Sequence, residues 1–72
     1  MLDIRSELRK IRKYEEISAK DLAKKASVSV NTIQSIENLR TFPNLKFIIK
    51  VLDVLGYKLI IVKNNGDINE TN

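Results

Sequence analysis

The side chains that enzymes use most often for proton transfer and nucleophilic attack are missing from this sequence. Its 72 residues include neither histidine nor cysteine, which removes the usual general base, the usual thiol nucleophile and most ligands of transition metals. The acidic side chains include Asp3, Glu7, Glu15, Glu16 and Asp53. These carboxylates are scattered, and their spacing predicts no metal cluster. We therefore expect a protein that is not an enzyme, that needs no metal or cofactor, and whose function is binding.

The balance of charge favours a polyanion as the binding partner. Thirteen lysine and arginine residues against nine aspartate and glutamate residues give a net charge of +4, and nine of the basic residues lie within residues 1–40. Such an excess suits a surface that faces phosphate, and it equally suits an ordinary soluble domain. No apolar run reaches membrane-spanning length and the N-terminus is charged, unlike a signal peptide, so we expect a cytoplasmic protein.

The length predicts one domain with a small core. We place this domain at residues 1–62 and expect the polar segment 63–72 to be a disordered tail. Because no disulfide or metal can staple the fold, surface from a partner is the expected supplement to its core.

Apolar spacing and capping residues predict three helices in the first half of the chain. The first covers residues 3–14, where apolar side chains recur every three or four positions. Ser18 begins a capping box for a short helix at 19–26. After a three-residue break, Ser29 is the natural N-cap of a third helix at 30–38.

The second half of the chain predicts a helix followed by a strand. Asn44 caps a helix over 44–55, which stops at Gly56 because glycine readily takes positive φ at a helix end. Eight of its twelve residues are apolar, which is too many for a helix that buries one face only. Residues 57–62, Tyr-Lys-Leu-Ile-Ile-Val, are rich in β-branched and aromatic types and predict a strand.

A twofold dimer explains both the excess apolar surface and the lone strand. Two copies of strand 57–62 would pair antiparallel, while the spare face of helix 44–55 packs on its mate. The alternative is an extended tail that folds back over its own core. We favour the dimer, with an interface predicted to comprise Phe47, Val51, Val54, Tyr57, Leu59 and Ile61.

Two short helices joined by a three-residue turn form a helix-turn-helix pattern. The string Ser-Val-Ser-x-x-Thr-Ile-x-x-Ile-Glu-Asn at 27–38 is its most specific part, and segment 8–55 resembles the Cro/repressor-type (XRE family) domain. The resemblance implies an all-α, lambda-repressor-like bundle of four to five short helices with one short C-terminal β-strand.

The end of segment 8–55 and the residues after it point to a particular group of proteins within this family. Leu55 and Gly56, followed directly by the aliphatic strand, resemble the DNA-binding antitoxins of the HipB type. In those proteins the strand pairs with its copy across the dimer axis. The resemblance implies a homodimer and, as a sharper possibility, a cognate toxin protein as partner.

In the family, the helix after the turn lies in the major groove of double-stranded DNA and meets base edges near its N-terminus. The resemblance assigns base contact to Val30, Asn31, Thr32, Gln34 and Ser35. Asn31 and Gln34 carry amides that can bond an adenine edge in bidentate fashion, a contact worth about 1–3 kcal/mol of discrimination. Val30 offers only an apolar contact. The alternative is that both amides are simply solvated helix surface.

Two further roles follow from family position. Ser29, Lys20 and Arg40 are predicted to contact DNA phosphates. Arg12 and Glu37 resemble a family pair that joins the first helix to the end of the third, and we expect a partly buried structural ion pair.

Four positions depart from the family pattern, among them Ser27, which replaces a common turn glycine. Ala19 stands where glutamine usually opens the second helix, Val30 is apolar, and Leu39 replaces the glycine that usually follows Glu-Asn. Because leucine is a poor residue for positive φ, we expect the loop after residue 38 to have a different geometry. The main expectation is a dimeric transcriptional repressor on an inverted repeat with half-sites about 10 bp or a multiple apart. The alternative is a protein-interaction module with weak or vestigial DNA binding, and the departures at Ala19, Val30 and Leu39 are the features that favour it.

Overall fold

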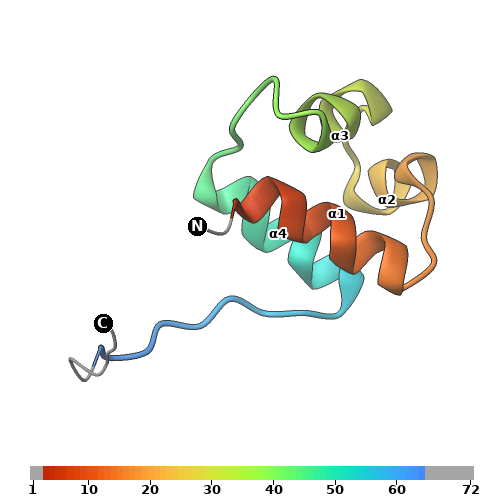
Figure 1. The fold of residues 1–72 in the computed structure, drawn as a ribbon. Coiled ribbons are helices and arrows are strands. Elements are labelled where there is room, and N and C mark those ends of the chain that lie inside the picture. The colour runs from red at the N-terminus through yellow and green to blue at the C-terminus, as the bar shows by residue number, and fades with distance from the viewer. Residues whose placement is uncertain (1–2, 65–72) are drawn as a thin grey trace.

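The computed structural model describes residues 3–64, which form four helices and no strand. The helices are α1 (Ile4–Tyr14), α2 (Ala19–Ala26), α3 (Val30–Glu37) and α4 (Leu45–Leu55) (Figure 1). In Figure 1, α2 and α3 lie above α1 and α4, and a long loop joins α3 to α4. The all-α prediction is confirmed. None of the described helices has the length and apolar character needed to span a membrane.

A side-chain cap begins each helix. The caps are Asp3, Ser18, Ser29 and Asn44. Each side chain accepts a hydrogen bond from a backbone N–H of the first turn, at 2.8 to 3.0 Å. Because such a cap contributes about 1 kcal/mol and fixes where the helix starts, the short helices have sharp beginnings.

A residue in the left-handed conformation ends each helix. Only one of the four is a glycine, and the residues are Glu16, Ser27, Leu39 and Gly56. After each, the next N–H reaches the carbonyl five residues back, as in the 2.8 Å bond from the Arg40 N–H to the Ser35 carbonyl. Leu39 has a φ of 62°, which is the left-handed conformation that a glycine would take at this position. The expectation of a different loop geometry after residue 38 is therefore wrong. The two hydrogen bonds of this Schellman-type end offset the cost of placing leucine there, about 1–2 kcal/mol.

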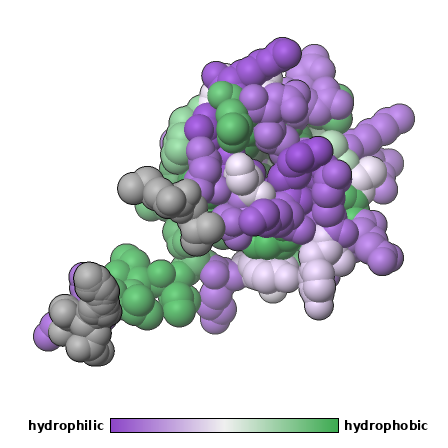
Figure 2. Space-filling model, in the orientation of Figure 1, coloured by the Kyte–Doolittle hydropathy of each residue, from purple (hydrophilic) through white to green (hydrophobic). Residues whose placement is uncertain are grey.

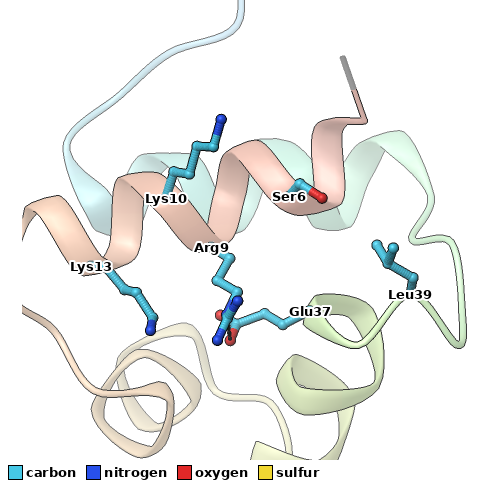
Figure 3. A pocket seen from close by; sticks show the side chains of 6 residues that line it. All are labelled: Ser6, Arg9, Lys10, Lys13, Glu37 and Leu39. Carbon is cyan, nitrogen blue, oxygen red and sulfur yellow. Dashed lines mark ion pairs between the residues drawn. The ribbon is translucent and has the colours of Figure 1, made fainter. Parts of the chain in front are cut away.

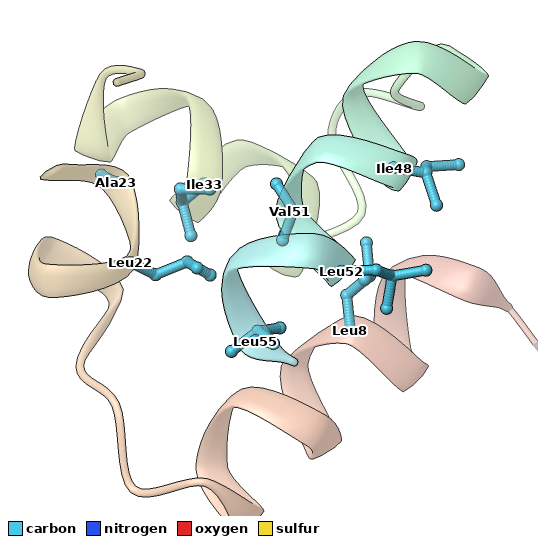
Figure 4. Close-up of a cluster of buried hydrophobic side chains, with 8 residues drawn as sticks. All are labelled: Leu8, Leu22, Ala23, Ile33, Ile48, Val51, Leu52 and Leu55. Atoms are coloured by element: carbon cyan, nitrogen blue, oxygen red, sulfur yellow. The ribbon is translucent and has the colours of Figure 1, made fainter. Parts of the chain in front are cut away.

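The core is a cluster of buried side chains drawn from all four helices (Figure 4). Its members are Leu8, Leu22, Ala23, Ile33, Ile48, Val51, Leu52 and Leu55. Half of them belong to α4, so this helix is the centre of the domain. Val51 is 2% exposed and faces this core, so its predicted place in a dimer interface is wrong. The face of α4 that carries Val51 packs against the core of its own chain, so it is not available to a second copy.

Residues 57–62 do not form the predicted strand in the single chain. A strand requires a second strand for its backbone hydrogen bonds, and the described residues offer none. The segment leaves the end of α4, turns back and runs below the helices in the view of Figure 1, and its apolar side chains project from the body in Figure 2. Ile61 is 99% exposed, so the alternative of a tail folded over its own core is also not what the structure has. Most of the predicted disordered tail, 63–72, lies outside the described residues.

Candidate nucleic-acid interface

The exposed face of α3 carries the polar side chains predicted to meet DNA bases. Ile33 and Ile36 are 3% and 4% exposed, and their burial fixes the rotation of the helix about its axis. With those two side chains inward, Asn31, Thr32 and Gln34 are exposed. Their groups therefore stand on one free surface at the start of the helix, where they can donate and accept hydrogen bonds.

The other two predicted base contacts are less accessible. Val30 is half-buried and packs against the core cluster, and Ser35 is also half-buried. Val30 thus helps to hold α3 in place, and only part of its side chain faces outward. The free surface of α3 is accordingly centred on the two amides, Asn31 and Gln34.

The predicted phosphate contacts lie at the ends of helices. Ser29 caps α3, its Oγ accepting from the Asn31 N–H at 3.0 Å, which leaves its hydroxyl proton to donate elsewhere. Lys20 is exposed in the first turn of α2, and Arg40 is exposed just after α3. Neither cation makes an ion pair with any described residue. Both are free to meet an anion.

Arg12 connects three parts of the fold. Its Nε lies 2.6 Å from Glu37 Oε2 and its Nη2 lies 2.9 Å from Oε1, a bidentate pair. Its Nη1 donates to the Ile17 carbonyl at 2.8 Å, just before α2 begins. The hydrogen bond to Glu37 raises the pKa of the Arg12 guanidinium, which is charged in any case. α1, the approach to α2 and the end of α3 are thereby held in one arrangement.

A hollow of about 270 Å³ opens between α1 and the end of α3 (Figure 3). It is lined by Ser6, Arg9, Lys10, Lys13, Glu37 and Leu39. The three cations of this lining were not among the residues predicted from the sequence, although Arg9 and Lys13 are four positions apart and so lie on one face of α1. No group of three or more acidic side chains among the described residues could hold a metal ion. The charged side chains that line this hollow are three cations and one carboxylate.

Arg5 anchors the loop that carries Arg40. Its Nη1 donates to the Thr41 carbonyl at 3.3 Å, and its guanidinium lies 4.8 Å from the centroid of the Phe42 ring. Asp3 holds Arg5 in turn, with Oδ2 2.7 Å from Nη2. The side-chain hydrogen bond from Arg5 lowers the pKa of the Asp3 carboxyl. The start of α1 therefore restrains the loop between α3 and α4.

The predicted dimer residues outside the core differ in accessibility. Phe47 and Val54 are half-buried and pack against the core, whereas Leu59 and Ile61 are exposed. Tyr57 is 38% exposed, and its hydroxyl donates to Glu15 Oε2 at 2.9 Å, which ties the start of the C-terminal segment to the end of α1.

Two apolar side chains of α4 that the sequence analysis did not select are exposed. Leu45 and Ile49 are 59% and 49% exposed and lie one turn apart on the same helix face. They are the apolar surface of α4 that the chain itself leaves uncovered. Periodicity alone did not separate them from Val51, because apolar residues surround most of this helix.

A helix-turn-helix family model matches residues 8–62. The match includes most of α1, all of α2, α3 and α4, and the segment after α4. A comparison with curated proteins finds no match.

Proposed function

The chain belongs to the XRE-type helix-turn-helix family of DNA-binding regulators, and we propose that it is a dimeric repressor that reads an inverted repeat through α3. The observation that carries this proposal is the exposed pair of amides, Asn31 and Gln34, on a helix whose rotation the core fixes. Side-chain amides at this position can bond adenine edges in the major groove.

The rigidity of α3 supports sequence-specific rather than general binding. Readout by hydrogen bonds needs side chains that are held at a defined distance from the DNA backbone. The bond of Arg12 to Glu37 fixes the end of α3, and the Ser29 cap fixes its start. Lys20 and Arg40 flank this helix on either side in the chain and would set the register on the phosphates.

The exposed apolar surface supports a second copy as the dimer partner. Leu59, Ile60, Ile61 and Val62 follow one another in the chain and are 46–99% exposed, and Leu45 and Ile49 of α4 are also exposed, at 59% and 49%. A soluble protein rarely leaves such a contiguous patch uncovered. Two copies of 57–62, paired antiparallel about a twofold axis, would bond the free backbone groups of both segments and cover their side chains.

An antitoxin is the sharper version of the same proposal, in which another surface holds a toxin. It is supported only by the resemblance of Leu55, Gly56 and the aliphatic segment to HipB-type antitoxins. The competing function is a protein-interaction module with weak DNA binding. Val30, half-buried where the family often has a polar residue, favours that alternative. In neither case do we propose catalysis.

Selection of binding sites from a random double-stranded DNA library tests the proposal. We expect enrichment of an inverted repeat with half-sites separated by about 10 bp or a multiple, because a twofold dimer presents two copies of α3. Affinity for the recovered repeat should fall steeply with salt. Recovery of no site would contradict the proposal and favour the interaction module, and a single unrepeated half-site would contradict the dimer.

A further inference from the structure

The hollow between α1 and the end of α3 holds more positive charge than its carboxylate neutralises. Both oxygens of Glu37 already accept from Arg12, at 2.6 and 2.9 Å. Arg9 Nε stays 3.9 Å from Oε1 and its side chain is 53% exposed. Lys13, in the same lining, makes no ion pair with a described residue. Arg9 and Lys13 are therefore two cations available to an outside anion.

Lys10 differs from these two. Its Nζ lies 3.4 Å from Glu7 Oε2, and Figure 3 shows its side chain pointing away from Glu37. In the same view Arg9 and Lys13 point toward the side of α1 on which α3 lies. Ser6, Arg9 and Lys13 follow one another at helical spacing and form a single stripe along α1.

The stripe belongs to the helix that contacts both elements next to the expected phosphate contacts. Arg12 bonds to Ile17, just before α2, and to Glu37, at the end of α3. Arg9 is one turn before Arg12 and Lys13 directly follows it. Arg9 and Lys13 thus belong to the helix that Arg12 joins both to the approach to α2, which carries Lys20, and to the end of α3, which Arg40 follows.

We propose that Arg9 and Lys13 bind DNA backbone phosphates, so that α1 is a third DNA-contacting element beside α2 and α3. This inference rests on the proposed function and adds two contacts to it. An arginine presents a fork of donors that fits phosphate oxygens, and a lysine acts as a compact point charge. These contacts carry no sequence information, because backbone phosphates are alike at every base pair.

The salt dependence of binding measures such contacts directly. The full chain and its variants are titrated onto a fluorescent mixed-sequence duplex of about 30 bp, long enough for two half-sites one helical turn apart. Each phosphate contact contributes about 0.9 to the magnitude of the slope of log Kobs against log salt, and a dimer makes each contact twice. Arg9→Gln and Lys13→Gln should therefore each reduce that magnitude by about 1.8, and the double variant should reduce it by about 3.6. Arg9→Lys keeps the charge and should keep the slope.

A matched control separates contact from net charge. Lys24 and Lys25 are exposed at the end of α2, and Lys24→Gln with Lys25→Gln removes the same two charges elsewhere. This control should keep a slope close to that of the unaltered chain. Equal slopes for the Arg9/Lys13 double variant and the unaltered chain would overturn the inference, as would an equal loss in the control.

The failure of the inference is distinguishable from the failure of the proposed function. If the unaltered chain does not bind the duplex at all, DNA binding itself is contradicted. If it binds with a steep slope that the double variant retains, only the role of α1 is contradicted. Lys13→Gln alone decides the matter should Arg9→Gln disturb folding, because Lys13 is exposed and makes no ion pair with a described residue.

Discussion

The Arg12 guanidinium and the Glu37 carboxylate form a bidentate ion pair, with Nε 2.6 Å from Oε2 and Nη2 2.9 Å from Oε1. The pair joins α1 to the end of α3 and is largely buried, since Arg12 is 9% exposed. The third contact of Arg12, to the Ile17 carbonyl at 2.8 Å, brings the approach to α2 into the same arrangement.

Replacing Glu37 tests whether this pair holds the fold. Glu37→Gln leaves the Arg12 charge partly buried without its partner, so we expect a loss of about 3 kcal/mol in the free energy of unfolding. Thermal unfolding followed by circular dichroism measures this loss as a lower melting temperature, which falls by about 4–8 °C for each kcal/mol in a domain of this size. Glu7→Gln, which removes an exposed pair with Lys10, is the matched control and should change little. A Glu37→Gln protein that melts like the unaltered chain would refute the structural role.

Leu39 offers a test of backbone strain. Its φ is 62° and its side chain is 50% exposed, so Leu39→Gly relieves the left-handed strain while removing little packing. We expect a gain of about 1 kcal/mol in the free energy of unfolding, measured by urea titration. Gly56→Ala is the opposite change, at φ 88°, and should destabilise although nothing lies within 4 Å of the added Cβ. A destabilised Leu39→Gly protein would show that the leucine side chain contributes more than its backbone costs.

In an extended segment successive side chains point to opposite faces, so Leu59 and Ile61 lie on one face of the C-terminal segment and Ile60 and Val62 lie on the other. Leu59→Lys with Ile61→Lys places charge on the face expected to lie against the mate, and we expect a monomer by sedimentation at micromolar concentration. Ile60→Lys with Val62→Lys alters the opposite face, at 67% and 74% exposure, and should leave more of the association intact. The dimer would be ruled out by a monomeric unaltered chain, or by a Leu59/Ile61 variant that associates as before.

Tyr57 predicts a dependence of stability on alkaline pH. Its hydrogen bond to Glu15 raises the pKa of the hydroxyl above the ordinary value of 10.0. A pKa raised by folding means that the contribution to stability is complete below pH 10 and is lost as pH rises through the raised value. The difference in melting temperature between the unaltered chain and Tyr57→Phe should therefore shrink above that pH. A difference that stays constant through the alkaline range would contradict the hydrogen bond.

Local chemistry determined what could be predicted from the sequence. Ser18, Ser29 and Asn44 cap helices as expected, because a side-chain cap acts on its own first turn and needs no tertiary contact. The conformation of Leu39 could not be read from its residue type, because the backbone bonds from the Leu39 and Arg40 N–H groups to the Ile36 and Ser35 carbonyls of α3 offset the strain of a left-handed leucine. The exposed amides of α3 followed from the inward spacing of two isoleucines.

The error at Val51 and the outcome at 57–62 have a different origin. The side of α4 that packs inward depends on the shape of the other three helices, and a helix that is apolar nearly all round does not encode it. A strand whose partner would be a second copy has no partner within one chain. The cations of α1 are available to an outside anion because Arg12 already binds both oxygens of Glu37, a tertiary contact that the charge pattern of α1 does not encode.

The most direct test of the central claim is to measure the affinity of Asn31→Ala and Gln34→Ala for the recovered inverted repeat and for its base-substituted variants. If α3 reads bases, each substitution should cost about 1–3 kcal/mol on the recovered site and relax the preference at one position of each half-site. Binding to mixed-sequence DNA should stay the same, because phosphate contacts remain. Unchanged affinity and unchanged preference in both variants would contradict base recognition by α3.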